Sequence, residues 1–285
     1  MSSIGRLKAL TFVIGAALAL GSADAGALDK VGHDKAIRLA FRDDAPPFSF
    51  TDEAGLPAGF MVDLCRSVAK HIGEELNIND LKVAYVLVTA ENRFDAIING
   101  KADLLCEPTS ETLARRAQVD FSIPTFVDGA SLLVGADGPS NFAALAGKKI
   151  GVLAGTTTEE SLRNMLGSAG LVAEITPAKT HQEGLAMLDK SEVVAYFADR
   201  AILSYLASKS SDASRLRLAN NYFSLEPYAL ALPRGDEDFR LEVDRALSHI
   251  YRSGEIAIIF AHTFGNQMQP SDILKTLYSV SALPD

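Results

Sequence analysis

The sequence predicts an α/β protein made of two successive strand–helix series. Short apolar strands alternate with helical segments, apolar residues recur every four positions in the longest predicted helix, and the alternation breaks once, near 124–129. Strands that alternate with helices usually form parallel sheets covered by helices on both faces. The 285 residues, of which 48% are hydrophobic, suffice for one or two globular domains with a core.

The first series begins with a strand at 36–41. A loop follows at 43–50, because Pro46 and Pro47 cannot continue a strand ladder. From Phe60 the four-residue spacing of apolar side chains predicts an amphipathic helix. The series ends with a strand at 82–88, a helix at 91–98 and a short strand at 103–106.

The second series repeats this rhythm. Its predicted strands are 130–134, 149–153, 172–175, 193–198 and 228–232, and its predicted helices are 142–145, 158–166, 182–188, 239–251 and 255–264. Ligands of open α/β sheets bind at the carboxyl ends of the strands. The candidate site therefore lies in the loops that follow Phe41, Val88, Cys106, Leu153 and Ala198.

The N-terminus and the charge balance narrow the class of protein. Arg6 and Lys8 precede a short apolar run at 10–20, and Ala23-Asp24-Ala25 offers a cleavage site, so residues 1–25 are predicted to be a signal peptide. The alternative, a membrane anchor, needs a longer apolar run. The 27 basic and 36 acidic residues give a net charge of −9, with no dense basic run after the N-terminus, so we expect no nucleic-acid partner.

The sequence contains two cysteines, Cys65 and Cys106. An even number in an exported chain favours a disulfide, and the alternative is two buried free thiols. The five histidines are scattered, with no spacing typical of a zinc site, so we expect neither a metal nor a cofactor. The sequence has no nucleophile elbow and no His-Glu-x-x-His motif, which argues against a hydrolase.

Three local features could bind a ligand, and each has a structural alternative. The loop before Thr158 opens a helix, where Thr157 and Glu160 fit a capping box and free N–H groups favour an anion. The alternative is an ordinary helix start. Arg115 could hold a carboxylate with two parallel hydrogen bonds, or it could be solvated. Asp199 could pair with an ammonium group or cap the next helix.

The chain after the signal peptide resembles the periplasmic polar amino-acid binding proteins of ABC importers over its whole length. Nine motifs match in order: 46–50, 59–64, 92–93 with 100–103, 112–115, 120–122, 155–157, Asp199, 226–228 and 253–255. The resemblance implies the two-lobed, type II periplasmic binding protein fold, in which each lobe has a mostly parallel sheet flanked by helices and two hinge strands join the lobes.

The resemblance also implies the division of the chain. Lobe 1 is expected at 36–125 plus 230–285 and lobe 2 at 130–226, with the crossings near 125–129 and 226–230. It further implies a monomer in the periplasm that binds an amino acid, performs no catalysis and delivers the ligand to ABC permease subunits in the inner membrane.

Within this family the chain is most similar to glutamate/aspartate binding proteins. This likeness implies that Arg115 holds the α-carboxylate of the ligand, that Ser110 matches a hydroxyl residue of the family's site, and that Thr157, with Thr156 beside it, matches the family's loop threonine. Asp199 and the carbonyl of Pro108 would receive the ammonium group.

The same likeness points to an acidic side chain on the ligand. Arg42, Arg93 and His181 match positions of acidic-ligand binders and are surplus to the needs of a zwitterion, so we expect them to meet a second carboxylate. If protonated His181 contacts it, glutamate binding should strengthen as the pH falls toward about 6. The alternative places Arg42 on the cleft rim, paired in solvent with Asp43 or Asp44.

Two other functions fit the same fold. Periplasmic cyclohexadienyl (prephenate/arogenate) dehydratases look similar, and Glu107 would be the general acid of such an enzyme. A ligand-binding adaptor for a membrane receptor or an oxidoreductase would need a separate partner chain. Ala90 and Pro108 stand where acidic-ligand binders often have serine, so they bear on side-chain selectivity.

Overall fold

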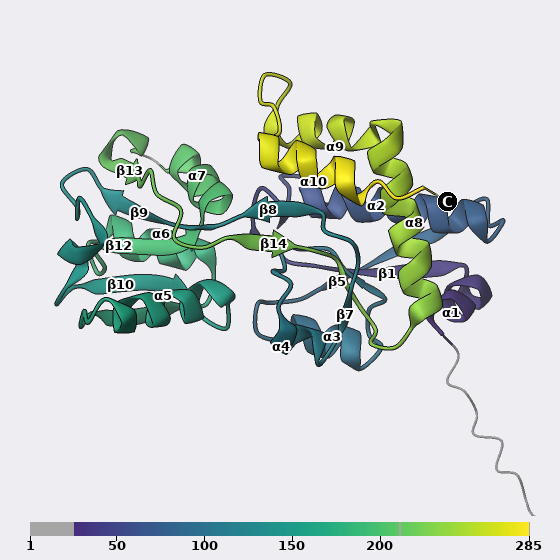
Figure 1. Cartoon of the computed structure of the whole chain (residues 1–285), viewed down its shortest axis with the longest axis horizontal. Helices are drawn as coiled ribbons and strands as arrows, with labels where there is room; N and C mark the ends of the chain where they lie inside the picture. The colour runs from purple at the N-terminus through teal and green to yellow at the C-terminus, as the bar shows by residue number, and fades with distance from the viewer. Residues whose placement is uncertain (1–25, 211, 285) are drawn as a thin grey trace, which may run out of the picture.

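The computed structural model describes residues 26–210 and 212–284, so the predicted signal peptide lies outside the described residues. The chain forms two lobes, each built around a five-stranded sheet (Figure 1). We call the lobe that holds both described ends of the chain lobe 1 and the other lobe 2. Among the described residues no helix is both long and apolar enough to cross a membrane.

The sheet of lobe 1 has the strand order β5-β1-β6-β15-β7. Its strands are β1 (Ala36–Phe41), β5 (Lys82–Leu87), β6 (Leu104–Leu105), β7 (Asp120–Phe121) and β15 (Ala231–Leu232). The first three run parallel, and β15 pairs antiparallel with both β6 and β7. A small second sheet, β2 (Asp44–Ala45), β3 (Ser49–Thr51) and β4 (Pro57–Ala58), lies beside it.

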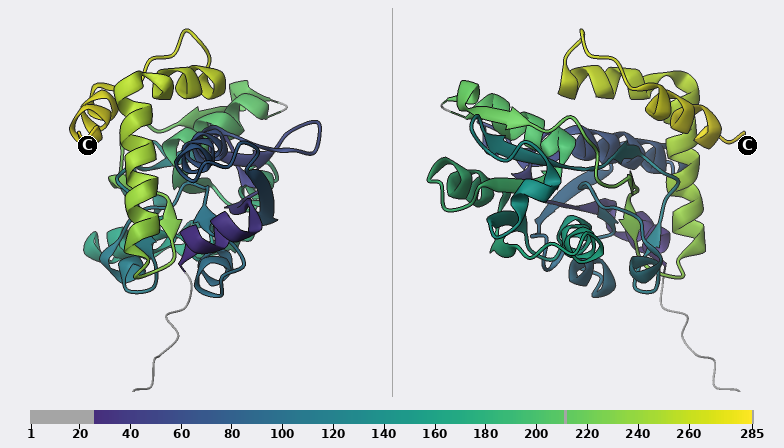
Figure 2. Two further views of the ribbon diagram at one scale, coloured as in Figure 1. Left: turned by 90° about the vertical axis from the view of Figure 1, so that its right-hand side faces the viewer. Right: turned by 60° about the vertical axis from the view of Figure 1, so that its left-hand side comes forward.

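The helices of lobe 1 come from both ends of the chain. They are α1 (Ala27–Asp34), α2 (Phe60–Glu75), α3 (Arg93–Ile98), α4 (Leu113–Arg116), α8 (Glu237–Ser253), α9 (Glu255–Phe264) and α10 (Asp272–Ser281). Helix α2 buries its apolar face against α8 and α9 (Figure 2). The C-terminal helices therefore return to lobe 1, as the family resemblance implies.

The sheet of lobe 2 has the order β11-β10-β12-β9-β13. Its strands are β9 (Ala130–Gly135), β10 (Lys149–Leu153), β11 (Glu174–Ala178), β12 (Ala195–Asp199) and β13 (Leu216–Leu218). Its helices are α5 (Thr157–Ser168), α6 (His181–Asp189), α7 (Arg200–Lys209) and the short 3₁₀ turns η1 (Phe142–Leu145) and η2 (Ala213–Arg215).

Two strands cross between the lobes as an antiparallel ribbon, β8 (Phe126–Asp128) with β14 (Glu226–Tyr228) (Figure 1). Phe126 and Tyr228 pack on Phe48, with ring centroids 4.9 and 5.4 Å away, which anchors the ribbon in lobe 1. A Cβ atom at Gly129 would lie 2.1 Å from the carbonyl oxygen of Ser224, so the ribbon is closely packed where it enters lobe 2.

The two-lobed fold class is confirmed, with mixed sheets. The expectation of purely parallel sheets was wrong for half of the pairings in the two five-stranded sheets, because one strand of each, β15 in lobe 1 and β9 in lobe 2, runs opposite to the other four. The loop predicted at 43–50 contains parts of two short strands, and helices α1, α7 and α10 were not predicted. The lobe boundaries stay a proposal that this topology supports.

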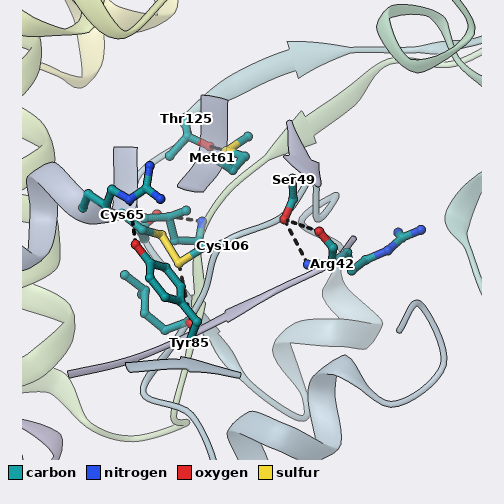
Figure 3. Close-up of a disulfide and its surroundings, with 11 residues drawn as sticks. Arg42, Ser49, Met61, Cys65, Tyr85, Cys106 and Thr125 are labelled. Carbon is teal, nitrogen blue, oxygen red and sulfur yellow. Dashed lines mark hydrogen bonds between the residues drawn. A yellow bond between two sulfur atoms is a disulfide. The ribbon is translucent and has the colours of Figure 1, made fainter. Parts of the chain in front are cut away.

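A disulfide joins Cys65 on α2 to Cys106 at the end of β6, with Cα atoms 6.0 Å apart (Figure 3). Both cysteines are fully buried and lie in lobe 1. The predicted bridge is therefore present, and the alternative of two free thiols is wrong. The bond fixes the chain two residues before Pro108, one of the residues predicted to bind the ligand.

Candidate functional site

All nine residues predicted to bind the ligand line one small cavity between the lobes. Lobe 1 contributes Arg42, Arg93, Pro108, Ser110 and Arg115, and lobe 2 contributes Thr156, Thr157, His181 and Asp199. Thr158 and Ile202 complete the lining. The structure therefore brings the whole predicted set together.

The topology explains this convergence. Arg42 directly follows β1, Arg93 opens α3 after β5, and Arg115 lies in α4, which follows β6. In lobe 2, Thr157 and His181 begin the helices that follow β10 and β11, while Asp199 ends β12. Parallel strands bring their carboxyl ends to one edge, and the two edges face each other across the cavity.

The loop that carries Arg115 is held against the crossing strands. The N–H of Glu111 donates to the carbonyl of Pro227 at 2.8 Å, and the N–H of Ala229 donates to the carbonyl of Thr109 at 3.1 Å. Thr112 caps α4 by accepting a hydrogen bond from the N–H of Arg115. The Arg115 guanidinium also donates to the carbonyl of Ser110 at 2.7 Å, which fixes its direction.

The start of the Arg42 loop is fixed by Ser49. The Ser49 hydroxyl accepts from the N–H of Arg42 at 2.9 Å and donates to its carbonyl at 3.0 Å (Figure 3). This local pairing holds the backbone where β1 ends. The guanidinium of Arg42 is buried, with 3% of the residue exposed.

Arg42 and Arg93 are already paired with acids of lobe 1. Arg42 Nε donates to Asp44 at 2.8 Å and Arg42 Nη1 donates to Glu107 at 3.4 Å. Arg93 Nε lies 3.3 Å from the other Glu107 oxygen, which also accepts from the Thr109 hydroxyl. The expectation that both arginines are surplus was therefore wrong, and so was the alternative of an Arg42–Asp44 pair in solvent, because the pair is buried.

The pairing does not satisfy every donor of the two arginines. Arg42 Nη2 and Arg93 Nε are buried and make no hydrogen bond within the described part of the chain. Burial opposes the charge of Arg42, but Glu107 and Asp44 outweigh it and raise its pKa. Burial, with Arg115 and Arg42 nearby, lowers the pKa of Arg93 to about 10, so it is charged at neutral pH.

Asp199 lies among two other buried acids at the lobe 2 end of the crossing strands. Asp128 and Glu226 face each other across the β8–β14 ribbon. Burial and these two carboxylates raise the pKa of Asp199 to about 8. Its Oδ1 makes no hydrogen bond in the described residues, and its side chain does not cap α7. Asp199 therefore occupies the N-cap position of α7, as the structural alternative predicted, but its side chain is not used as a cap.

The threonine loop of lobe 2 differs from the predicted capping box. Thr156, rather than Thr157, caps α5 by accepting from the N–H of Glu159, and the Glu159 side chain accepts from the N–H of Gly155. The Thr157 side chain therefore does not cap α5, and it lines the cavity. Its hydroxyl donates to Glu226 at 3.1 Å and lies 3.2 Å from the Ser110 hydroxyl, a contact between the lobes.

His181 lines the cavity but does not titrate near neutral pH. Its Nδ1 is 3.0 Å from the Tyr196 hydroxyl. Burial and the nearby charge of Arg42 lower the pKa of His181 to about 3. The expected strengthening of glutamate binding near pH 6 through protonated His181 is therefore contradicted.

Glu107 does not have the position of a general acid. It is 0% exposed, it does not line the cavity, and both of its oxygens are engaged by Arg42, Arg93 or Thr109. Asp44 is a buried partner of Arg42 that the sequence alone did not indicate. The described residues hold no group of three or more His, Cys, Asp or Glu side chains placed to bind a metal ion.

A protein-family comparison decides the relationship. The model of the bacterial extracellular solute-binding proteins, family 3, matches residues 37–266. This chain belongs to that family. The match spans both lobes and both crossing strands, and it agrees with the resemblance seen in the sequence motifs.

Two curated relatives and one solved structure extend this result. An L-glutamate/L-aspartate-binding protein of Pseudomonas aeruginosa is 33% identical over 87% of this chain and 83% of its own length. A glutamate/aspartate import solute-binding protein of Salmonella typhimurium is 28% identical over 94% and 91%. An ancestral arginine-binding protein bound to glutamine has a TM-score of 0.73 and 27% identity, over 81% of this chain and 99% of its own.

These similar proteins are named as binding proteins rather than enzymes. That agrees with a chain that binds a ligand without catalysis.

Proposed function

We propose that this chain captures a polar amino acid in the periplasm and delivers it to an ABC importer, with glutamate or aspartate as the ligand. One observation carries the amino-acid assignment: Arg115 of lobe 1 and Asp199 of lobe 2, whose Oδ1 makes no hydrogen bond in the described residues, line the same cavity. A guanidinium on one side and a carboxylate on the other match the α-carboxylate and the ammonium of a zwitterion.

The proposal that the ligand has an acidic side chain rests on Arg42 and Arg93. Arg42 and Arg93 line the cavity, and each has a buried guanidinium nitrogen without a hydrogen bond in the described residues. Arg42 Nη2 lies 2.7 Å from Asp44 and Arg93 Nε lies 3.3 Å from Glu107, but neither contact forms a hydrogen bond. Carboxylate oxygens of a ligand would offer these nitrogens better-aligned acceptors. The names of the Pseudomonas and Salmonella relatives support the same ligand class.

The crossing strands support capture by closure. They form a two-stranded ribbon between lobes that each carry part of the cavity. Bending of this ribbon would open the cavity to solvent, and a ligand held by both lobes would stabilise the closed form. We expect the closed form to be the one that the importer recognises.

Calorimetric titration of the purified protein with glutamate, aspartate, glutamine and asparagine tests the proposal. We expect saturable binding, with the acids bound more tightly than their amides. Absence of binding by any amino acid in a panel of the twenty would contradict the amino-acid assignment. Displacement of labelled glutamate by glutamine at equal concentration would contradict only the acidic preference.

A further inference from the structure

Glu107 lies directly behind the two arginines that line the cavity. It follows Cys106, which the disulfide fixes, and it is 0% exposed. One carboxylate oxygen accepts from Arg42 at 3.4 Å, and the other lies 3.3 Å from Arg93. Because Glu107 does not line the cavity, it acts on a ligand through the guanidinium groups around it, most directly those of Arg42 and Arg93.

The local charges balance before any ligand is added. Arg42 and Arg93 contribute two positive charges, and Asp44 and Glu107 contribute two negative charges within ion-pair distance. His181, which lines the same cavity, is neutral because burial and Arg42 lower its pKa to about 3. Asp44 reaches only Arg42, whereas Glu107 reaches both arginines and therefore has the larger influence on the pair.

We infer that Glu107 determines ligand specificity as a resident counter-charge that limits how strongly Arg42 and Arg93 prefer an acidic over an amide side chain. This inference rests on the proposed amino-acid binding at the same cavity. A carboxylate on the ligand has to share the guanidinium groups with Glu107, whereas an amide oxygen adds no further negative charge. The cleft of this chain is therefore expected to admit glutamine alongside glutamate.

The decisive variant is Glu107→Gln, which removes the charge and keeps the shape. Without the resident carboxylate, the two buried guanidinium groups depend on the ligand for a counter-charge. We expect the ratio of glutamate to glutamine affinity to rise by about tenfold or more, since coupling between close buried charges is of that size or larger. Titration calorimetry with both ligands measures the ratio.

Two controls separate the effect of charge from other effects. Glu174→Gln changes the net charge equally but alters an exposed ion pair of lobe 2 with Lys149, so it should leave the ratio unchanged. The double variant Arg93→Gln with Glu107→Gln removes both partners of one pair, so the ratio should return toward the wild-type value. A purely structural role for Glu107 predicts no such reversal.

The outcomes are distinguishable. If the wild-type protein binds glutamate or glutamine and Glu107→Gln leaves the ratio within about twofold, which is under 0.5 kcal/mol, the inference fails and the proposed function stands. If the wild-type protein binds no amino acid, both fail. If Glu107→Gln does not fold alone, the double variant is compared with Arg93→Gln. Equal ratios of glutamate to glutamine affinity in these two variants would overturn the inference, and a higher ratio in the double variant would support it.

Discussion

Lobe 1 supplies three arginines to the cavity, whereas lobe 2 supplies threonines, a neutral histidine and one acid, Asp199. The guanidinium groups of Arg42, Arg93 and Arg115 lie around one edge of lobe 1, and the ring of Phe94 lies 4.7 and 5.3 Å from the last two. Under the proposed function, lobe 1 would meet the anionic groups of the ligand and lobe 2 its ammonium group, so the ligand would bridge both lobes.

The two sets also differ in how they are held. Arg42 and Arg93 are held by buried acids of their own lobe. Asp199 instead lies near two other acids, which raise its pKa, and its Oδ1 makes no hydrogen bond in the described residues. Lobe 1 therefore presents a preorganised surface. Lobe 2 presents a destabilised carboxyl group that gains from an incoming cation.

Loss of Arg115 should have the largest effect on binding. Arg115→Ala removes the guanidinium opposite Asp199 and leaves the ligand carboxylate unpaired in a desolvated cavity, so affinity should fall by about 3–5 kcal/mol. Calorimetric titration with glutamate measures the loss. Arg116→Ala, at the exposed neighbour, should bind as the wild type does. Retained affinity in Arg115→Ala would refute the role of this arginine.

Removal of the disulfide should weaken lobe 1 more than lobe 2. The double variant Cys65→Ser with Cys106→Ser opens a loop with a sequence separation of 41, for which chain entropy gives about 4 kcal/mol of lost stability. Hydrogen exchange read by mass spectrometry should show faster opening of α2 and β6 than of the sheet of lobe 2. Two free thiols in the unfolded, unreduced wild-type protein would show that the bond is absent.

Asp199→Asn should discriminate between ligands with and without an ammonium group. The variant removes a charge-assisted hydrogen bond of about 1.5–3 kcal/mol, so glutamate should bind roughly tenfold more weakly or worse. 2-Oxoglutarate, which has no ammonium group, should lose far less. Equal losses for both compounds would mean that Asp199 does not meet the ammonium group.

The smallest expected effect is the change of glutamate affinity with pH, and the raised pKa of Asp199 sets its direction. In the free protein the pKa of Asp199 is raised to about 8, so its carboxyl is largely protonated at pH 6 and must lose a proton to pair with an ammonium. Glutamate affinity should therefore fall from pH 8 to pH 6, by no more than it does in Asp199→Asn, because the protonated carboxyl resembles the amide. His181 adds nothing in this range, since its pKa is about 3. Titrations at both pH values check the sign, and stronger binding at pH 6 would contradict it.

The raised pKa of Asp199 also has a consequence for stability. Between the ordinary pKa of an aspartate and about 8, the folded protein holds a proton at Asp199 that the unfolded chain releases. The contribution of Asp199 to the free energy of unfolding is thus fully present below the ordinary value and declines as the pH rises through this window. Asp199→Asn should remove that part of the decline in thermal unfolding.

The sequence located the cavity residues because they follow strands and match family motifs, yet it could not show how they pair. Asp44 is two residues from Arg42, but only the fold shows that both are buried together. Asp128 and Glu226 lie 98 residues apart in the chain and meet through strand register. The neutrality of His181 depends on burial, which no sequence pattern reports.

Among the missed helices, α7 had a usable signal. Ile202, Leu203 and Leu206 are buried at helical spacing after Asp199, and this pattern predicts an amphipathic helix. Helix α1 is only 8 residues long and has a mixed composition, so local propensity is weak. Its position is set by packing on lobe 1, where the N–H of Ala27 donates to Asp236 at 2.6 Å.

The order of strands in lobe 1 has a consequence for the growing chain. Strand β7 stands at the edge of its sheet and pairs only with β15, which comes 110 residues later, after all of lobe 2. Lobe 2 is continuous in sequence and can complete its sheet while lobe 1 still lacks a strand. Cys65 and Cys106 both precede lobe 2, so their bond can close early. While the chain folds, the bond would hold α2 against the incomplete sheet of lobe 1 until β15 has formed and paired with β6 and β7.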